Sequence, residues 1–265
     1  MTTLRSFVDV PHGQLWVEHT GPGRPAVVLA HGGLGDSRMW DHQATALAGD
    51  HHVIRYDQRG YGRSPAPTHP FSHVGDLDAV LDHAGADRAV LVGTSVGGAT
   101  VIDYALDHPE RVAGLVCVAA GLSGYPSRPT PAMQEFEAAV GSGDADRMLA
   151  SALAVWAPLR TSAEVDARIR GLIVDALSGL RTLGRFWVDH PPAYGRLAGI
   201  TASTLAVAAD VDEPDFIRIA ELLARDIPTA DLVVLPGVDH NIPVRAAAEL
   251  TRVLQQFLTR IQETP

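Results

Sequence analysis

Residues 92–98 read VGTSVGG, and the five residues that begin at Gly93 match the pattern G-x-S-x-G around Ser95. The apolar run AVLVG at 89–93 comes before the match, and a helix-like stretch opens at Gly97. In this context the pattern puts a serine on a sharp turn between a strand and a helix, where its hydroxyl is exposed. The surrounding glycines leave room for such a turn. The stretch therefore predicts a nucleophilic serine, and the rest of the chain has to supply its partners.

Short runs that are apolar throughout alternate with helix-like stretches along the chain. Such runs are typical of parallel strands that helices cover on both faces. They occupy residues 26–30, 53–56, 89–93, 113–120, 204–209 and 231–237. The helix-like stretches lie at residues 38–48, 72–85, 97–108, 214–226 and 245–261. The chain begins with SFVDV and QLWVEH, which alternate like an antiparallel hairpin. This order predicts an α/β fold with one doubly wound, mostly parallel sheet of eight strands flanked by helices.

The segment from residue 123 to residue 198 interrupts this alternation. It contains no strand-like run, and its apolar residues follow helical spacing in PAMQEFEAAV, ADRMLASALAVWA and AEVDARIRGLIVDALSGL. An all-helical insertion between two strands predicts a cap over one end of the sheet. We therefore expect a core domain made of residues 1–122 and 199–265, with residues 123–198 inserted in it as a helical cap, or lid.

Composition and charge exclude several classes of protein. The chain of 265 residues is 46% hydrophobic and 20% charged, which is ordinary for a folded globular protein. Its net charge of −10, with no cluster among the 21 Lys and Arg residues, argues against nucleic acid as a partner. No apolar run is long enough to span a membrane, and MTTLRSFVDV is unlike a signal peptide. Together with the single cysteine, Cys117, these features predict a cytoplasmic protein without a membrane partner.

A serine hydroxyl is a poor nucleophile unless a base accepts its proton and a third group orients that base. In an open parallel sheet such groups collect just past the carboxyl ends of the strands. Downstream, TLAVAADVDEP ends its strand with Asp210 and Asp212, and DLVVLPGVDHNIP ends its strand with Asp239 and His240. The chain order of serine, aspartate and histidine is that of the G-x-S-x-G hydrolases. The pattern by itself leaves Asp210 and Asp212 as alternative acids.

These segments resemble the α/β-hydrolase fold over nearly the whole chain. AVVLAHGGLGDSRMW is similar to the third strand and oxyanion loop of that family, and HVIRYDQRGYGRS to the fourth strand and its loop. LVGTSVGGATVIDYALDHPERVAGLVCVAA resembles the nucleophile elbow with its helix and next strand. LAVAADVDEPDF resembles the strand that bears the acid, and LVVLPGVDHNIPVRAAAELTRVLQQFL the histidine loop and final helix. The five segments stand in the order that the family requires.

The resemblance implies a catalytic triad. Ser95 would be the nucleophile and His240 the general base and acid. In relatives the acid usually stands three residues after a glycine that closes its strand; here Ala209 takes that place, so that Asp212 is implied as the acid. The histidine is commonly preceded by glycine, but here by Asp239. We expect the Asp239 carboxylate either to compete with Asp212 for the imidazole or to point to solvent.

The resemblance also implies an oxyanion hole and a substrate pocket. The backbone N–H groups of Gly33 and Val96 would bind the oxyanion, with Leu34 close by. Arg38, from the oxyanion loop, is a candidate contact for an anionic group of the substrate, whereas Trp40 is expected in the core. The cap supplies further candidate pocket residues with large apolar surfaces and a few polar atoms. These are Trp156, Phe186, Trp187, His190 and Tyr194.

The function implied by the resemblance is that of a serine hydrolase. It would cleave a carboxylic ester or lactone of a medium-sized organic molecule through an acyl-enzyme. A serine at the elbow argues against dehalogenase and epoxide hydrolase activities, which use aspartate there. Carbon–carbon bond hydrolase, haloperoxidase, non-hydrolytic lyase or cyclase, and ligand-binding roles remain alternatives on this fold. No cofactor is expected, and no metal, since the chain lacks H-E-x-x-H and Cys-His zinc spacings. We expect a monomer or a homodimer with a small-molecule substrate.

Overall fold

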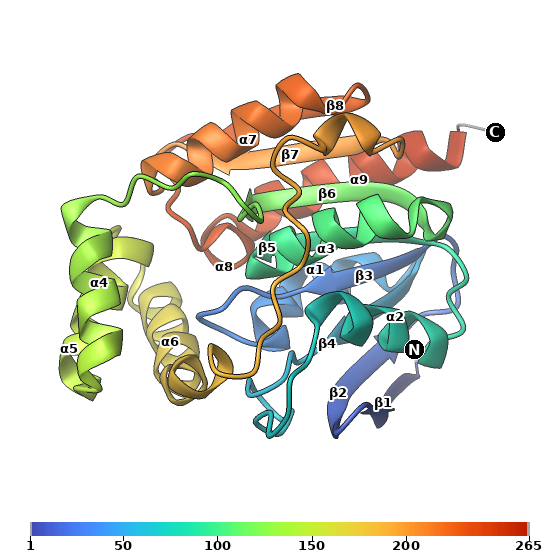
Figure 1. Cartoon of the computed structure of the whole chain (residues 1–265). Coiled ribbons are helices and arrows are strands. Elements are labelled where there is room, and N and C mark those ends of the chain that lie inside the picture. The colour runs from blue at the N-terminus through green and yellow to red at the C-terminus, as the bar shows by residue number, and fades with distance from the viewer. Residues whose placement is uncertain (1, 264–265) are drawn as a thin grey trace.

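The computed structural model describes residues 2–263, apart from the side chains of 181–183, and it is built around one sheet of eight strands (Figure 1). The order across the sheet is β1-β2-β4-β3-β5-β6-β7-β8. The strands are β1 Thr3–Val10, β2 Gly13–Thr20, β3 Ala26–Ala30, β4 His52–Tyr56, β5 Ala89–Ser95, β6 Val112–Ala120, β7 Thr204–Ala209 and β8 Ala230–Leu235. Strand β2 is antiparallel to β1 and β4, and the other pairs are parallel. The predicted mostly parallel sheet is confirmed.

Helices cover both faces of the sheet. The α-helices are α1 Asp41–Leu47, α2 His73–His83, α3 Val96–Asp107, α4 Pro131–Ser142, α5 Ala145–Trp156, α6 Ala163–Leu183, α7 Pro214–Asp226, α8 Ile242–Arg245 and α9 Ala247–Glu263. Short 3-10 helices are η1 Ser37–Trp40, η2 Pro109–Arg111 and η3 Leu197–Gly199. The helix that we expected over 38–48 is thus η1 followed by α1. The one expected over 245–261 begins earlier and is divided at Ala246, whose backbone leaves the helical region.

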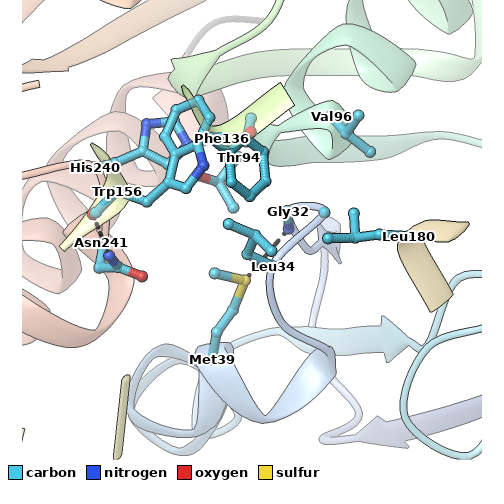
Figure 2. Close-up of a pocket in the computed structure, with 12 residues that line it drawn as sticks. Gly32, Leu34, Met39, Thr94, Val96, Phe136, Trp156, Leu180, His240 and Asn241 are labelled. Atoms are coloured by element: carbon cyan, nitrogen blue, oxygen red, sulfur yellow. Dashed lines mark hydrogen bonds between the residues drawn. The ribbon is translucent and has the colours of Figure 1, made fainter. Parts of the chain in front are cut away.

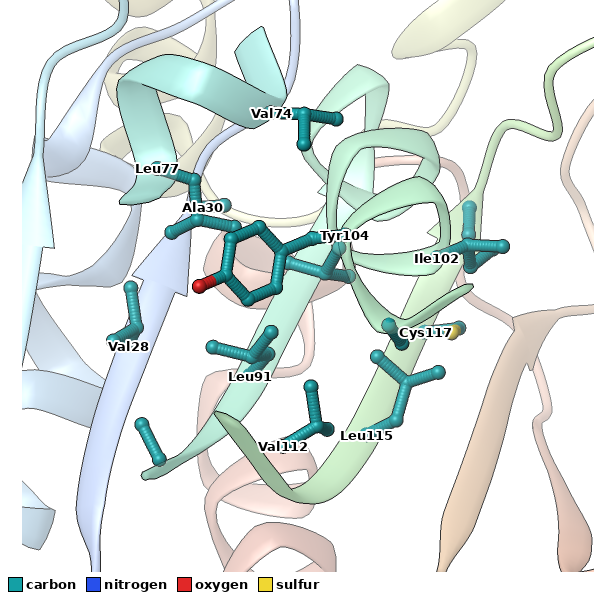
Figure 3. Packing of buried hydrophobic residues seen from close by; sticks show 14 of the residues in the cluster. Val28, Ala30, Val74, Leu77, Leu91, Ile102, Tyr104, Val112, Leu115 and Cys117 are labelled. Atoms are coloured by element: carbon teal, nitrogen blue, oxygen red, sulfur yellow. The ribbon is translucent and has the colours of Figure 1, made fainter. Parts of the chain in front are cut away.

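The central strands are buried on both faces, as their apolar sequences predict. Successive side chains of a strand point to opposite faces. In β5, Leu91 packs on the face covered by α2, α3 and α7, whereas Val90 and Val92 pack on the face covered by α1 and α9. Figure 3 shows the first of these layers, in which Leu91 and Leu115 lie against Tyr104 and its neighbours on α3. The sheet therefore forms a rigid base for the loops at its strand ends.

The turn between β5 and α3 is tightly packed. Ser95 has φ 53° and ψ −120°, a backbone conformation that residues other than glycine rarely adopt. A Cβ on Gly97 would lie 2.5 Å from the carbonyl oxygens of Ala30 and His31, and one on Gly93 would lie 2.2 Å from the Gly97 oxygen. Only glycine fits at these two positions. The strain at Ser95 persists because the packed strand and helix fix it, a situation that recurs at functional sites.

The segment between β6 and β7 is largely helical, as its spacing predicts. Helices α4, α5 and α6 lie together at one end of the sheet (Figure 1). After α6 the described chain runs mostly in irregular conformation up to η3, and at one of its contacts with the core Phe71 forms an isolated bridge with Trp187. There Phe71 N donates to Phe186 O at 2.9 Å, and Val188 N donates to Phe71 O at 2.9 Å. This irregular stretch carries most of the aromatic residues that we expected in a substrate pocket.

Candidate active site

A cavity of about 150 Å³ opens beside the turn at Ser95 (Figure 2). Four parts of the chain meet there: the loop after β3, the turn between β5 and α3, the helices of the insertion, and the loop that carries His240. The residues that line the cavity are Gly32, Gly33, Leu34, Met39, Thr94, Ser95, Val96, Phe136, Trp156, Leu180, His240 and Asn241. Most of them are apolar, so Ser95 and His240 border a mainly apolar cavity.

His240 and Asp212 form a close pair at the edge of this cavity. The Nδ1 atom of His240 lies 3.0 and 2.9 Å from the two carboxylate oxygens of Asp212. The Asp212 side chain is 1% exposed and that of His240 is 11% exposed. The carboxylate also accepts a hydrogen bond from Glu213 N at 2.7 Å. With its Nδ1 proton donated to Asp212, the imidazole keeps Nε2 available to accept a proton from the cavity side.

The alternative acid, Asp210, has a different position. Its Oδ1 accepts hydrogen bonds from Gly237 N at 2.6 Å and Val238 N at 3.4 Å, in the turn that follows β8. Gly237 has a φ of 69° and supplies the sharp bend of that turn. Asp210 therefore holds the backbone of the histidine loop, while Asp212, two residues further on, reaches the imidazole.

The Asp239 carboxylate takes neither of the two positions that we expected. Its side chain is fully buried, so it does not point to solvent, and it bonds to Arg245 rather than competing for the His240 ring. The Arg245 Nε atom lies 2.9 Å from the carboxylate, and the backbone N–H of Leu159 donates to it at 3.3 Å. A buried carboxylate is stable only when a cation and hydrogen-bond donors compensate it. Arg245 supplies the cation, and the backbone N–H groups of Leu159 and Asn241 supply further donors.

Arg245 also ties the histidine loop to the helical insertion. Its guanidinium donates to Asp166 Oδ1 at 2.9 Å, to Thr161 Oγ1 at 2.7 Å and to Leu159 O at 3.2 Å. These three residues come from the connection between α5 and α6 and from α6 itself. The insertion is thus fastened to the core beside His240.

Two aromatic rings hold the imidazole from its sides. The ring centroids of Trp156 and Phe216 each lie 4.6 Å from that of His240. Trp156 ends α5 and Phe216 lies in the first turn of α7, so one ring comes from the insertion and the other from the core. Phe136 of α4 packs against Trp156 with a centroid distance of 6.0 Å. The imidazole is therefore restricted to a narrow range of orientations.

The loop after β3 is held by a buried histidine. His31 Nδ1 lies 2.8 Å from Gly32 O, and its Nε2 accepts a hydrogen bond from Gln58 N at 2.8 Å. Burial lowers the pKa of His31, so the ring is neutral, with one nitrogen donating and the other accepting. This arrangement presents Gly33 and Leu34 to the cavity opposite Val96, the first residue of α3. Backbone N–H groups in the first turn of a helix have no partner within the helix.

A second, larger cavity of about 450 Å³ shares Ser95 and Val96 with the first. It extends along α3 toward the irregular stretch after α6. Its lining residues are Ser72, His73, Val74, Ser95, Val96, Ala99, Thr100, Asp103, Gly121, Leu122, Ser123, Gly124, Trp187, Val188, Asp189, His190, Pro192 and Phe216. This cavity has a more polar lining than the first, and the turn at Ser95 lies where the two meet.

The structure brings only some of the expected pocket residues to these cavities. Trp156 borders the first cavity, and Trp187 and His190 border the second. Trp40, expected in the core, is fully buried. Phe136, Leu180, Phe216 and Asn241 border the cavities without having been predicted, because helical spacing shows which residues share a face but not which way the insertion turns that face.

Arg38, Phe186 and Tyr194, which we also expected in the pocket, line neither cavity. Arg38 is bound by carboxylates: its Nη2 lies 2.6 Å from both Asp36 Oδ2 and Asp175 Oδ2, at a separate hollow on the surface. Phe186 packs into a small apolar cluster with Tyr61 and Phe71. Tyr194 is 44% exposed and contacts Tyr125 edge-on.

The described residues 2–263 contain no group of three or more His, Cys, Asp or Glu side chains placed to hold a metal ion. Over the same residues no helix is both long and apolar enough to cross a bilayer. Cys117 is buried in β6, and burial raises the pKa of its thiol.

The family model described as alpha/beta hydrolase fold matches residues 25–246, and the chain belongs to this family of hydrolases. Its resemblance to that family, inferred from the sequence, is confirmed.

Individual relatives are named for different substrates. The chain is 34% identical over 267 residues to "Putative carbamate hydrolase RutD" of Variovorax paradoxus, covering 93% of this chain and 97% of that protein. It is 29% identical over 260 residues to 2-hydroxy-6-oxononadienedioate/2-hydroxy-6-oxononatrienedioate hydrolase of Burkholderia vietnamiensis, covering 91% and 89%. Among solved structures, Est816, an N-acyl homoserine lactone degrading enzyme, has a TM-score of 0.77 at 28% identity and covers 95% of this chain and 100% of that one.

The buried His73, which borders the second cavity, is expected to make the free energy of unfolding depend on pH. Burial lowers the pKa of His73 to about 3, with His31 and Arg59 adding smaller repulsion. The unfolded chain, whose histidine titrates near 6.5, therefore binds a proton that the folded chain excludes, and stability falls as the pH decreases from about 6.5 toward 3. Replacing His73 with phenylalanine removes this contribution. We subtract the free energy of unfolding of the variant from that of wild type. This difference is expected to decrease by up to about 1.4 kcal/mol for each unit by which the pH falls within that range.

Urea unfolding of both proteins at several pH values between 4 and 8 measures this difference. The two proteins share all their carboxylates, so the contribution of these groups to the pH dependence cancels in the difference. A difference that stays constant with pH would show that His73 binds its proton equally well in the folded and unfolded chain.

Proposed function

We propose that this protein is a serine hydrolase that cleaves a carboxylic ester or lactone through an acyl-enzyme, with Ser95, His240 and Asp212 as its catalytic triad. One observation carries the proposal. Ser95, at a strained turn between a strand and a helix, borders the same apolar cavity as His240, whose Nδ1 lies 2.9 Å from a buried Asp212 oxygen. A serine, a histidine and an orienting carboxylate in this relation are the parts that nucleophilic acyl transfer requires.

The proposed reaction has two halves. In the first, Ser95 Oγ attacks the substrate carbonyl while His240 Nε2 takes the hydroxyl proton, and the imidazolium is stabilised by Asp212. His240 then gives this proton to the leaving alcohol, and the acyl group stays on Ser95. In the second half, His240 takes a proton from water, the resulting hydroxide attacks the acyl-enzyme, and the proton returns to Ser95 as the acid leaves.

The negative charge on the carbonyl oxygen needs donors that are already oriented. We assign this role to the backbone N–H groups of Gly33 and Val96, with Leu34 beside them, because all three residues border the cavity around Ser95. Each such donor contributes about 3 kcal/mol toward the transition state. The neutral His31 supports them by holding the Gly33 loop against Gln58.

The insertion of residues 123–198 is proposed to act as a cap that selects the substrate. Trp156, Phe136 and Leu180 come from it and form much of the apolar wall of the first cavity. A volume of about 150 Å³ suits a small apolar portion of a substrate, while the adjoining 450 Å³ receives the larger remainder. The substrate would therefore be a medium-sized organic molecule that straddles Ser95.

The relatives support attack on a carbonyl that bears a heteroatom. A carbamate and a homoserine lactone both have this group, and the names of two relatives refer to them. The third name refers to a dioate, and a substrate with two carboxylates needs cationic contacts. The sequence has no lysine, and arginine is absent from the described residues that line either cavity. These facts favour an uncharged or cationic ester or lactone over carbon–carbon cleavage of a dicarboxylate.

Labelling with a fluorophosphonate tests the proposal. Such reagents form a stable phosphonyl ester with a serine that a neighbouring base activates. We expect one adduct per chain, on the peptide that contains Ser95, with loss of activity toward 4-nitrophenyl esters in proportion to labelling. Heat-denatured protein serves as the control and should remain unlabelled. Folded protein that stays unmodified would favour a non-hydrolytic role, such as ligand binding.

A further inference from the structure

The second cavity follows one face of α3 away from Ser95. Val96, Thr100 and Asp103 border it, and their spacing of three and four residues puts them on the same side of the helix. Trp187 and His190, from the irregular stretch after α6, lie among its other lining residues. The cavity is therefore a continuous path from the serine turn to the carboxylate of Asp103.

The Asp103 carboxylate is buried but has few donors. Its Oδ1 accepts a hydrogen bond from Ser123 Oγ at 2.6 Å, and Ser123 Oγ in turn accepts one from Ala193 N at 2.8 Å. Among the described residues no other group donates to Asp103, although a carboxylate offers about four acceptor positions. Burial raises the pKa of this carboxyl group. A donor brought by a ligand would compensate the buried charge that Ser123 satisfies only in part.

A second polar group in the cavity lacks a partner. His73 is 6% exposed, and its Nδ1 atom makes no hydrogen bond to any part of the chain that the structure describes. Its ring borders the cavity and is fixed by Phe71 and Trp187, whose centroids lie 5.0 and 4.9 Å away. Buried polar atoms without partners are rare in folded proteins and commonly mark a place that a water or ligand fills. Since the ring is neutral, it adds no positive charge to the cavity.

The charges around the cavity are mostly negative. Asp103 and the exposed Asp189 border it, and the described lining residues include no arginine. The side chains of His190 and Arg196 lie beside a third carboxylate: His190 Nε2 is 2.9 Å and Arg196 Nη2 is 3.7 Å from oxygens of Asp107. Both side chains also act weakly to lower the pKa of the Asp103 carboxyl group, against the larger effect of burial. A cation entering the cavity would be attracted to Asp103, and an anion would be repelled.

We infer that the second cavity is a substrate subsite for a protonated amine, which Asp103 binds while the neutral His73 ring accepts a further hydrogen bond from the ligand. The inference rests on the proposed function, because it assigns the part of the substrate beyond the bond that Ser95 attacks. Asp103 lies eight residues after Ser95 along α3, which corresponds to about 12 Å along the helix axis. The amine therefore lies several bonds from the carbonyl, on a chain that follows α3.

A matched pair of esters tests the subsite. In 4-nitrophenyl 6-aminohexanoate and 4-nitrophenyl heptanoate the acyl chains have equal length, and only the first ends in an ammonium group. A second pair, 6-aminohexyl and heptyl acetate, puts the same groups on the alcohol side. We expect kcat/KM of wild type to favour the amine in one pair, and Asp103→Asn to lower that ratio about tenfold, the usual contribution of a charge-assisted hydrogen bond.

The variant is chosen to keep the fold, since an asparagine oxygen can still accept from Ser123. Asp50→Asn is the control, because it removes the same charge at an exposed turn, and it should leave the ratio within twofold. An unchanged ratio in Asp103→Asn, or no preference for the amine in either pair, would overturn the assignment.

Binding of n-hexylamine tests the proposed amine subsite independently of ester hydrolysis. Calorimetric titration of wild type and Asp103→Asn should show about tenfold weaker binding to the variant. If neither ester pair is hydrolysed, the proposed function fails, while a binding difference at Asp103 would still support the subsite. Equal binding to the two proteins would reject the subsite even if the esters are turned over.

Discussion

Replacing Ser95 with alanine is expected to lower kcat for 4-nitrophenyl acetate by at least about 10⁴-fold. In the proposed mechanism the variant lacks the hydroxyl that forms the acyl-enzyme, and His240 has no serine proton to accept. The residual rate would come from the oxyanion donors acting on a bound ester that water attacks. Steady-state kinetics with purified variant and wild type measure the effect.

The fold of this variant should be unchanged. Alanine keeps the Cβ of serine, so the strain of a φ of 53° is the same in both proteins. Circular dichroism and thermal unfolding check this point. Ser142→Ala is the matched control, since it removes a serine hydroxyl at the exposed end of α4, and its kcat should stay within twofold of wild type. Activity of Ser95→Ala above a tenth of wild type would exclude Ser95 as the nucleophile.

The sheet could be predicted from the sequence because each strand is specified by residues that are neighbours in the chain. Each central strand is a short apolar run, and alternation with helices of fixed spacing leaves few ways to arrange such runs. The bounds of β3 and β7 agree with the apolar runs at 26–30 and 204–209. The turn at Ser95 was predictable from the G-x-S-x-G pattern between an apolar run and a helix-like stretch. The structure adds that a Cβ on Gly97 would collide with the carbonyl oxygens of Ala30 and His31.

The parts that escaped prediction depend on contacts between distant segments. Asp239 is held by Arg245, and Arg245 by Leu159, Thr161 and Asp166 of the insertion, so no pattern around His240 could show where the carboxylate points. The pocket aromatics are a similar case. Apolar spacing correctly predicted the helices of the insertion, but the orientation of the irregular stretch after α6, with Phe186 in a small cluster, is a tertiary property.

Asp210 and Asp212, the two candidate acids, are told apart by their contacts in the folded structure. Asp210 and Asp212 follow the same strand and are separated by one residue, so the residue pattern could not choose between them. The choice of Asp212 rested on the resemblance alone. The structure places Asp212 at 2.9 Å from His240 and uses Asp210 to hold the turn at Gly237, which gives the two carboxylates different expected effects on catalysis.

Replacing Asp212 with asparagine is expected to lower kcat for 4-nitrophenyl acetate by about 10⁴-fold, with little effect on KM. The asparagine oxygen can still accept from Glu213 N, but its amide can also turn an N–H group toward His240 Nδ1. An imidazole that accepts at Nδ1 carries its proton on Nε2, and it then cannot take the proton of Ser95. The loss of the carboxylate also removes the charge that stabilises the imidazolium.

Asp210→Asn is the matched control for this experiment, and its kcat should remain within about fivefold of wild type. The same charge is removed two residues away, and an asparagine oxygen can keep the hydrogen bond from Gly237 N. Steady-state kinetics of the two variants, with thermal unfolding as a check on folding, therefore separate the acid of the triad from a residue that only holds the loop. A large loss in Asp210→Asn together with an active Asp212→Asn would reverse the assignment, because His240 would then have to turn to the other carboxylate during the reaction.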